Sequence, residues 1–83
     1  MKLLYFAWLK VKTGVSEEDV TPPAEVTTVA QLLAWLKTRG PGYAEALSDF
    51  SALRVAVNQE YAKPSDPVAP GDEVALFPPV TGG

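Results

Sequence analysis

The sequence predicts an α+β domain in which a mixed β-sheet packs on one main helix. The prediction rests on one strongly amphipathic segment over residues 28–39, strand-like apolar segments on both sides of it, and a length of 83 residues. A chain of that length forms one domain and buries about 60% of the surface that its unfolded form exposes. Apolar residues make up 47% of the chain, which is enough to fill one core.

The first third of the chain is expected to form two strands. Lys2–Leu9 (KLLYFAWL) is rich in β-forming residues and predicts the first strand. Both of its faces are apolar, which is typical of a strand in mid-sheet with both faces covered. Gly14 then supplies a turn. The polar segment Val15–Pro22 is predicted to be an edge strand paired with the first, because prolines at its end cannot donate to a further strand.

The clearest helix is predicted over residues 28–39. Thr28 and Gln31 have the spacing of a capping box, in which each side chain accepts a hydrogen bond from an unpaired backbone N–H. Apolar residues three and four positions apart form one stripe, which comprises Val29, Leu32, Leu33 and Leu36. Gly40 and Pro41 end the helix. A shorter helical turn is expected over Tyr43–Phe50.

Strands are predicted again in the last third. Leu53–Asn58 alternates inward and outward residues, and Asn58-Gln59 is expected to turn the chain into a short strand that contains Tyr61. Glu73–Phe77 (EVALF) predicts the final strand, which two prolines end. Two strands, a helix and two further strands, in that order, are typical of a β-grasp, or ubiquitin-like, domain. We assign residues 1–77 to this domain and residues 78–83 to a flexible carboxyl-terminal tail that ends in Gly-Gly.

The composition excludes several classes of function. The chain has no cysteine and no histidine, which excludes disulfides, zinc fingers, thiolate-bound iron–sulfur clusters and Ser–His or Cys–His catalytic pairs. The net charge of −3 argues against binding to nucleic acid. The apolar segments are much shorter than the ~20 residues that cross a bilayer, and no signal-peptide cleavage site follows the first. We therefore expect a cytoplasmic protein that does not bind a membrane, a metal ion or a cofactor.

The carboxyl terminus is the most informative segment. Gly82 and Gly83 contribute nothing to a strand or helix, and glycine loses the most conformational freedom when it is ordered. Two residues without Cβ atoms can, however, enter a channel that admits little more than the main chain, and present the terminal carboxylate to a partner's active site. Residues 78–83 reach roughly 20 Å when extended at ~3.3 Å per residue. A frayed tail or the start of a linker is the alternative interpretation.

The segment Gly71–Gly83 (GDEVALFPPVTGG) resembles the carboxyl-terminal signature of the molybdopterin synthase small subunits, the sulfur-carrier proteins of molybdenum cofactor biosynthesis. Val57-Asn58-Gln59 is similar to a turn of that family, and Leu4-Tyr5-Phe6-Ala7 is similar to its opening strand. The chain departs from the family at Lys10-Val11, where Arg-Glu is common. Lysine keeps the charge of arginine but lacks its bidentate geometry, so partner contacts inferred from this region do not carry over.

The resemblance implies a chemistry for the terminal residues. Gly83 would be adenylated by an ATP-dependent enzyme of the ubiquitin-activating type, and a sulfur donor protein would then convert it to a thiocarboxylate. Gly82, which has no side chain, would leave room for Gly83 to enter the partner's active site. The residues implied to seat the tail in partners are Phe77, Pro78, Pro79, Val80 and Thr81.

The resemblance also implies partners. Within a heterotetramer, the tail would enter the synthase large subunit and donate sulfur to a pyranopterin precursor to make molybdopterin. The chain would be the non-catalytic subunit of that complex, and ATP would be used by the activating enzyme alone. The apolar faces of the first strand, with Phe77 beyond the core, predict an exposed apolar patch that the large subunit covers.

Other functions stay open at this point. A ubiquitin-like modifier would be conjugated through Gly83 to lysines of target proteins, and a related sulfur carrier would serve thiamine synthesis or tRNA thiolation. A β-grasp interaction module with an inert terminus is a further alternative. The P-P-V-T segment before Gly82 favours the molybdopterin role, since thiamine-pathway carriers usually lack it and conjugated modifiers more often have an Arg-containing tail.

Overall fold

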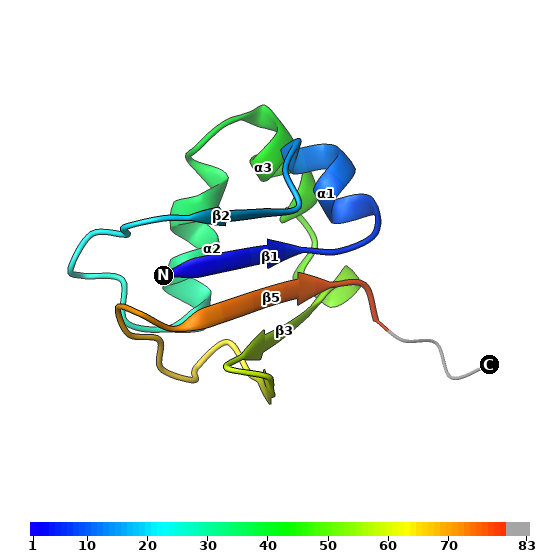
Figure 1. Cartoon of the computed structure of the whole chain (residues 1–83). Helices are drawn as coiled ribbons and strands as arrows, with labels where there is room; N and C mark the ends of the chain where they lie inside the picture. Colours follow the sequence, from blue (N-terminus) through cyan, green and yellow to red (C-terminus); the bar gives the residue numbers. More distant parts are fainter. Residues whose placement is uncertain (80–83) are drawn as a thin grey trace.

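Within residues 1–79, which the structure, a computed structural model, describes, five strands form one mixed sheet. Their order across the sheet is β2-β1-β5-β3-β4, so the last strand in sequence lies in the middle (Figure 1). β1 and β5 run parallel, and the other neighbouring strands are antiparallel. The strands are β1 (Lys2–Tyr5), β2 (Glu17–Asp19), β3 (Arg54–Val57), β4 (Glu60–Ala62) and β5 (Glu73–Phe77).

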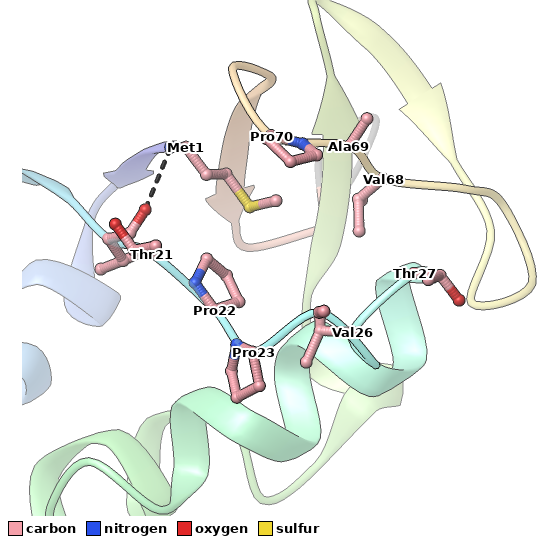
Figure 2. A pocket seen from close by; sticks show the side chains of 11 residues that line it. Met1, Thr21, Pro22, Pro23, Val26, Thr27, Val68, Ala69 and Pro70 are labelled. Atoms are coloured by element: carbon pink, nitrogen blue, oxygen red, sulfur yellow. Dashed lines mark hydrogen bonds between the residues drawn. The ribbon is translucent and has the colours of Figure 1, made fainter.

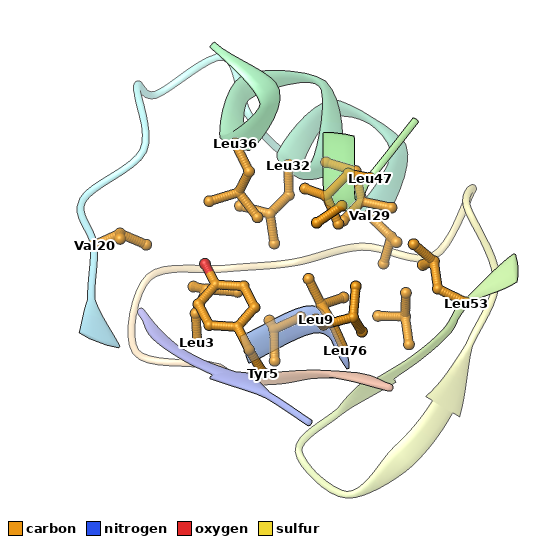
Figure 3. Packing of buried hydrophobic residues seen from close by; sticks show 14 of the residues in the cluster. Leu3, Tyr5, Leu9, Val20, Val29, Leu32, Leu36, Leu47, Leu53 and Leu76 are labelled. Atoms are coloured by element: carbon orange, nitrogen blue, oxygen red, sulfur yellow. The ribbon is translucent and has the colours of Figure 1, made fainter. Parts of the chain in front are cut away.

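Helices cover one face of this sheet. The main helix is α2 (Val29–Lys37), as predicted, and both halves of its capping box are formed. The Gln31 amide N–H donates to the Thr28 hydroxyl at 3.2 Å, and the Thr28 amide donates to the Gln31 side-chain oxygen at 3.1 Å. All four residues of the predicted stripe are buried. Figure 3 shows three of them facing the inner side chains of the strands, among them Leu3 and Leu76.

The first strand is shorter than predicted, and this part of the prediction is wrong. β1 ends at Tyr5, and the chain reverses at Ala7 to enter α1 (Trp8–Thr13). Helix α1 places Leu9 in the core with no exposed surface. Gly14, with a φ of 87°, ends α1 in a left-handed conformation that suits glycine.

The expectation that both faces of the first strand are covered is also wrong. The helices pack on one face only, so Leu4 stays half-buried and Phe6 is 49% exposed. The remaining strands form where they were expected, with β2 at the edge. Asn58 and Gln59 both have positive φ, 51° and 70°, as in the two-residue turns that favour β-hairpins.

The predicted second helical turn begins earlier than expected. Helix α3 (Pro41–Ala46) starts at a proline, whose fixed φ and missing N–H suit the first turn of a helix. A short 3₁₀ turn, η1 (Phe50–Ala52), follows it. α3 packs against α1, where the backbone of Gly42 meets the carbonyl group of Lys12. An α+β domain with one main helix is confirmed.

Candidate functional site

The base of the tail is held in the middle of the sheet. β5 pairs with β1 on one side and with β3 on the other, up to the pairs Tyr5–Leu76 and Arg54–Phe77. The Phe6 amide N–H adds a hydrogen bond of 3.1 Å to the Leu76 carbonyl. Pro78 and Pro79 therefore follow a strand that is fixed along both edges. The predicted reactive residue Gly83, and with it Val80, Thr81 and Gly82, lie outside the described residues.

One face of the sheet carries no helix, and it is largely apolar around β5, although Arg54, the partner of Phe77, lies on the same face. Side chains alternate between the two faces of a strand, and paired residues of neighbouring strands share a face. The pairs Leu4–Ala75, Ala56–Ala75 and Ala56–Tyr61 place these residues together, opposite the core. We call this surface the open face, and it comprises Leu4, Phe6, Ala56, Tyr61, Ala75 and Phe77. The predicted exposed apolar patch is thus present, and the predicted site residue Phe77 is a half-buried part of it.

A strained turn lies beside the end of β5. Ala7 has φ 55° and ψ −133°, a conformation that residues with a Cβ rarely adopt. Such strain costs about 1–3 kcal/mol and persists only where the surrounding structure enforces it. The turn leaves Phe6 and Trp8 49% and 39% exposed, close to where the tail begins. The sequence gives no signal for it, because an apolar run without glycine or proline also fits a strand.

A hydrogen-bonded cluster joins β1, β2 and α3 on the helix-covered side. The Glu18 carboxylate accepts hydrogen bonds of 2.8 Å from the hydroxyls of Tyr5 and Tyr43 and pairs with Arg39 at 2.8 Å. The Arg39 guanidinium lies over the rings of Trp35 and Tyr43. Burial acts to raise the pKa of Glu18, but the hydrogen bonds from Tyr43, Arg39 and Tyr5 outweigh it and hold that pKa below its usual range.

This cluster is structural. Burial, followed by the hydrogen bond to Glu18, raises the pKa of Tyr5 above its ordinary value, so the hydroxyl stays protonated at neutral pH. Hydrogen bonds from three donors stabilise the charged form of a carboxylate, which makes it a poor proton acceptor for a substrate. No local sequence pattern indicates the cluster, since its members come from segments far apart in the chain.

The side chains of the described residues suggest neither a metal site nor a membrane span. Among residues 1–79, no group of three or more His, Cys, Asp or Glu is placed to hold a metal ion. No helix in this part of the chain is both long and apolar enough to cross a bilayer. The whole sequence also contains no histidine and no cysteine.

The strand order, the single main helix and the central position of the last strand in sequence define a ubiquitin-like β-grasp protein. The chain belongs to the ThiS family, whose model matches residues 3–83. A human and an Escherichia coli K12 protein, both named molybdopterin synthase sulfur carrier subunit, are 37% and 39% identical to it. These matches cover all of this chain and 93% and 99% of those proteins.

A solved structure supports the same assignment. The crystal structure of small archaeal modifier protein 1 from Haloferax volcanii has a TM-score of 0.79 and 29% sequence identity to this chain. The match covers 96% of this chain and 97% of that chain. The predicted β-grasp fold and the predicted family resemblance are both confirmed.

Proposed function

We propose that this chain is the sulfur carrier subunit of a molybdopterin synthase and carries sulfur as a thiocarboxylate on Gly83. The observation that carries this proposal is that the family match extends through Gly82 and Gly83. The relatives named as sulfur carrier subunits match the chain along its full length. The central position of β5 supports it, since a tail that must enter a partner needs a fixed base.

The first step of the proposed cycle is activation, because a carboxylate is a poor electrophile. In an adenylating enzyme of the ubiquitin-activating type, the Gly83 carboxylate attacks the α-phosphate of ATP, forms an acyl-adenylate and releases pyrophosphate. Hydrosulfide released by a sulfur donor then attacks the acyl carbon, displaces AMP and leaves the thiocarboxylate. The absence of histidine and cysteine from this chain agrees with such a division of labour, in which partners supply the acids and bases.

The second step is transfer. The tail enters the large subunit of the synthase, and two successive transfers of sulfur to a pyranopterin precursor build the dithiolene of molybdopterin. Gly82 keeps the channel free of side chains, while the residues that seat the tail are Phe77, Pro78, Pro79, Val80 and Thr81. The open face packs on the large subunit in a heterotetramer of two small and two large subunits. We place this cycle in the cytoplasm.

A protein-modifier role is the second candidate, and the likeness to small archaeal modifier protein 1 favours it. It shares the adenylation of Gly83 but ends in an amide bond to a lysine of another protein. A sulfur carrier for thiamine synthesis or tRNA thiolation shares the thiocarboxylate and differs in the acceptor. The identity of the product formed from the activated chain therefore distinguishes these candidate functions.

The test is a reconstituted transfer. Thiocarboxylated chain, purified large subunit and the pyranopterin precursor should yield molybdopterin and return the unmodified chain. Gly82→Val should abolish transfer, because a β-branched side chain adds bulk and restricts the backbone in the channel. Val11→Ala is the matched control, since Val11 is 76% exposed on α1, outside the open face. Lysine adducts in place of molybdopterin would overturn the proposal.

A further inference from the structure

Arg54 places a cation on the side of the sheet that carries no helix. Arg54 is the β3 residue paired with Phe77 on β5, so its side chain lies on the same face of the sheet as that ring. Together with Tyr61 of β4, these two residues line a shallow hollow of about 390 Å³. The Arg54 guanidinium therefore borders the open face beside the last residue before Pro78 and the tail.

Arg54 has no carboxylate partner in the part of the chain that the structure describes. Its guanidinium carries several N–H donors, and within residues 1–79 the one acceptor for them is the Leu53 carbonyl oxygen, at 3.1 Å. The other donors find no acceptor among those residues, and the side chain is exposed to solvent. The positive charge of Arg54 is thus available to a partner.

Lys2, a second cation on this side of the sheet, is by contrast neutralised within the chain. The residues paired with it on the neighbouring strands are Asp19 of β2 and Glu73 of β5. Its ammonium forms an ion pair with Glu17 at 3.2 Å. A partner that covers this side of the sheet therefore needs to supply a counter-charge for Arg54 but not for Lys2.

The charged amino terminus is too far from Arg54 to take its place. Since β1 and β5 run parallel, Met1 lies where both strands start, next to the pair Lys2–Glu73. Its ammonium donates to the Val20 carbonyl at 3.0 Å, beside a separate cavity of about 250 Å³ (Figure 2). Arg54 lies at the other end of β5, about 13 Å away at ~3.3 Å per residue. Because charges are largely screened beyond about 10 Å at physiological salt, a carboxylate at Arg54 interacts mainly with Arg54.

The position of Arg54 determines what a docked partner must offer. A protein that packs on Phe77 and Tyr61 also removes the neighbouring guanidinium from water. Burial of a charge without a counter-charge is strongly unfavourable. A carboxylate removes that penalty, because it accepts two parallel hydrogen bonds from a guanidinium.

We propose that the synthase large subunit presents an aspartate or glutamate to Arg54, and that this ion pair fixes the orientation of the two subunits where the tail begins. The inference rests on the proposed function, since it concerns the partner that the open face is proposed to bind. Apolar contacts supply attraction with little directional preference, whereas a bidentate ion pair beside Phe77 defines one orientation. Arg54 is thus a residue of partner specificity and not of catalysis.

The first test is titration calorimetry of the full chain with the purified large subunit. Arg54→Gln should weaken binding at least about tenfold, and Arg54→Glu should weaken it further, because two carboxylates would then face each other. Lys37→Gln is the matched control, since it changes the net charge equally at an exposed position of α2, on the helix-covered side. Its affinity should stay within about twofold of the wild type. Added salt should weaken binding of the wild type more than binding of Arg54→Gln.

A cross-linking experiment identifies the carboxylate of the large subunit. In its complex with Arg54→Lys, a carbodiimide should join the introduced amine to an aspartate or glutamate through an amide bond. The carbodiimide takes up the water that is lost and becomes a urea. Mass spectrometry of the digested complex locates the bond. Replacement of the identified residue by arginine should then restore binding of Arg54→Glu.

The outcomes separate this inference from the proposed function. Wild-type affinity of Arg54→Gln, equal losses in Arg54→Gln and Lys37→Gln, or no bond from position 54 to the large subunit would each overturn the ion pair. None of these results touches the proposed function as long as the wild type binds the large subunit and yields molybdopterin. A wild type that does neither would overturn the proposed function, and the ion pair with it. The variants should keep the denaturant midpoint of the wild type, because Arg54 is exposed.

Discussion

The rings of Tyr61 and Phe77 lie 5.9 Å apart on the open face, on two strands that β3 separates. The β3 residue paired with Tyr61 is Ala56, whose small side chain leaves room between the rings, and the β3 residue paired with Phe77 is Arg54. The two ring planes are tilted by 51° to each other. The distance between the ring centroids lies within the range at which aromatic pairs attract each other. The base of the tail thus carries an aromatic patch that spans three strands.

Phe77→Ala should weaken the association with the synthase large subunit by about 2 kcal/mol, as expected for a central aromatic anchor of an interface. Phe77 is half-buried, so the variant should lose less folding stability than Leu76→Ala, which removes a fully buried side chain. Titration calorimetry measures the affinity, and Val11→Ala serves as the control. Unchanged affinity of the Phe77 variant would show that the open face does not bind that subunit.

Gly42→Ala should lower the free energy of unfolding by about 1–3 kcal/mol, the usual cost of overpacking. A Cβ on Gly42 would overlap the backbone carbonyl of Lys12, which cannot move without shifting α1. Gly14→Ala is the comparison, because that Cβ would meet no atom and only the positive φ would be unfavourable. Urea denaturation should rank Gly42→Ala as the more destabilising change, and the reverse order would contradict the close packing of α1 and α3.

Leu33→Ala should cost roughly 2–5 kcal/mol of stability, because Leu33 lies on the buried side of α2 and is only 4% exposed. Thr28→Ala should cost about 1 kcal/mol through loss of the helix cap. Denaturant midpoints give both values, and an adenylation assay corrected for the folded fraction should show unchanged chemistry at Gly83. A harmless Leu33→Ala together with a severe Trp35→Ala would mean that α2 faces the sheet with another side.

Glu18→Gln should destabilise the fold by about 1–3 kcal/mol at pH 7, since three donors lose their charged acceptor. The folded-state pKa of Glu18 is lowered, so its stabilisation is complete above the ordinary glutamate pKa of about 4.3 and is lost as the pH falls through the lower folded value. Urea midpoints at pH 7, 5, 4 and 3 should therefore converge for the two proteins at the acid end.

The control for this experiment is Glu25→Gln, which changes an exposed carboxylate on the β2–α2 connection. It should stay within about 0.5 kcal/mol of the wild type at every pH. A constant difference between the wild type and Glu18→Gln down to pH 3 would contradict the assigned role of the Glu18 carboxylate.

The sequence predicts those elements whose signals are local. The capping box at Thr28 and the spacing of the apolar stripe define α2, and the Asn58-Gln59 pair defines its hairpin. The reversal at Ala7 is different, because it depends on Leu9 reaching the core from α1, and nothing in Phe6–Leu9 distinguishes a turn from a strand. Short apolar runs carry this ambiguity in general.

The features of the candidate site also differ in whether a local sequence signal predicts them. Gly82 and Gly83 could be recognised because a motif at a chain end needs no tertiary context. The open face could be expected only in outline, since which side of β1 is covered depends on the placement of α2. The Glu18 cluster joins segments distant in sequence, so no pattern along the chain indicates it.

The most direct test of the central claim is the intact mass of the chain after incubation with an adenylating enzyme of the ubiquitin-activating type, ATP and a sulfur donor. The wild type should gain about 16 Da, the difference between sulfur and oxygen, at Gly83. A variant with one residue appended after Gly83 should gain nothing and keep its melting temperature, because the added side chain blocks entry to the active site while the tail contributes little to the core. No gain in the wild type, or an equal gain in the extended variant, would contradict the assignment of Gly83 as the sulfur-carrying residue.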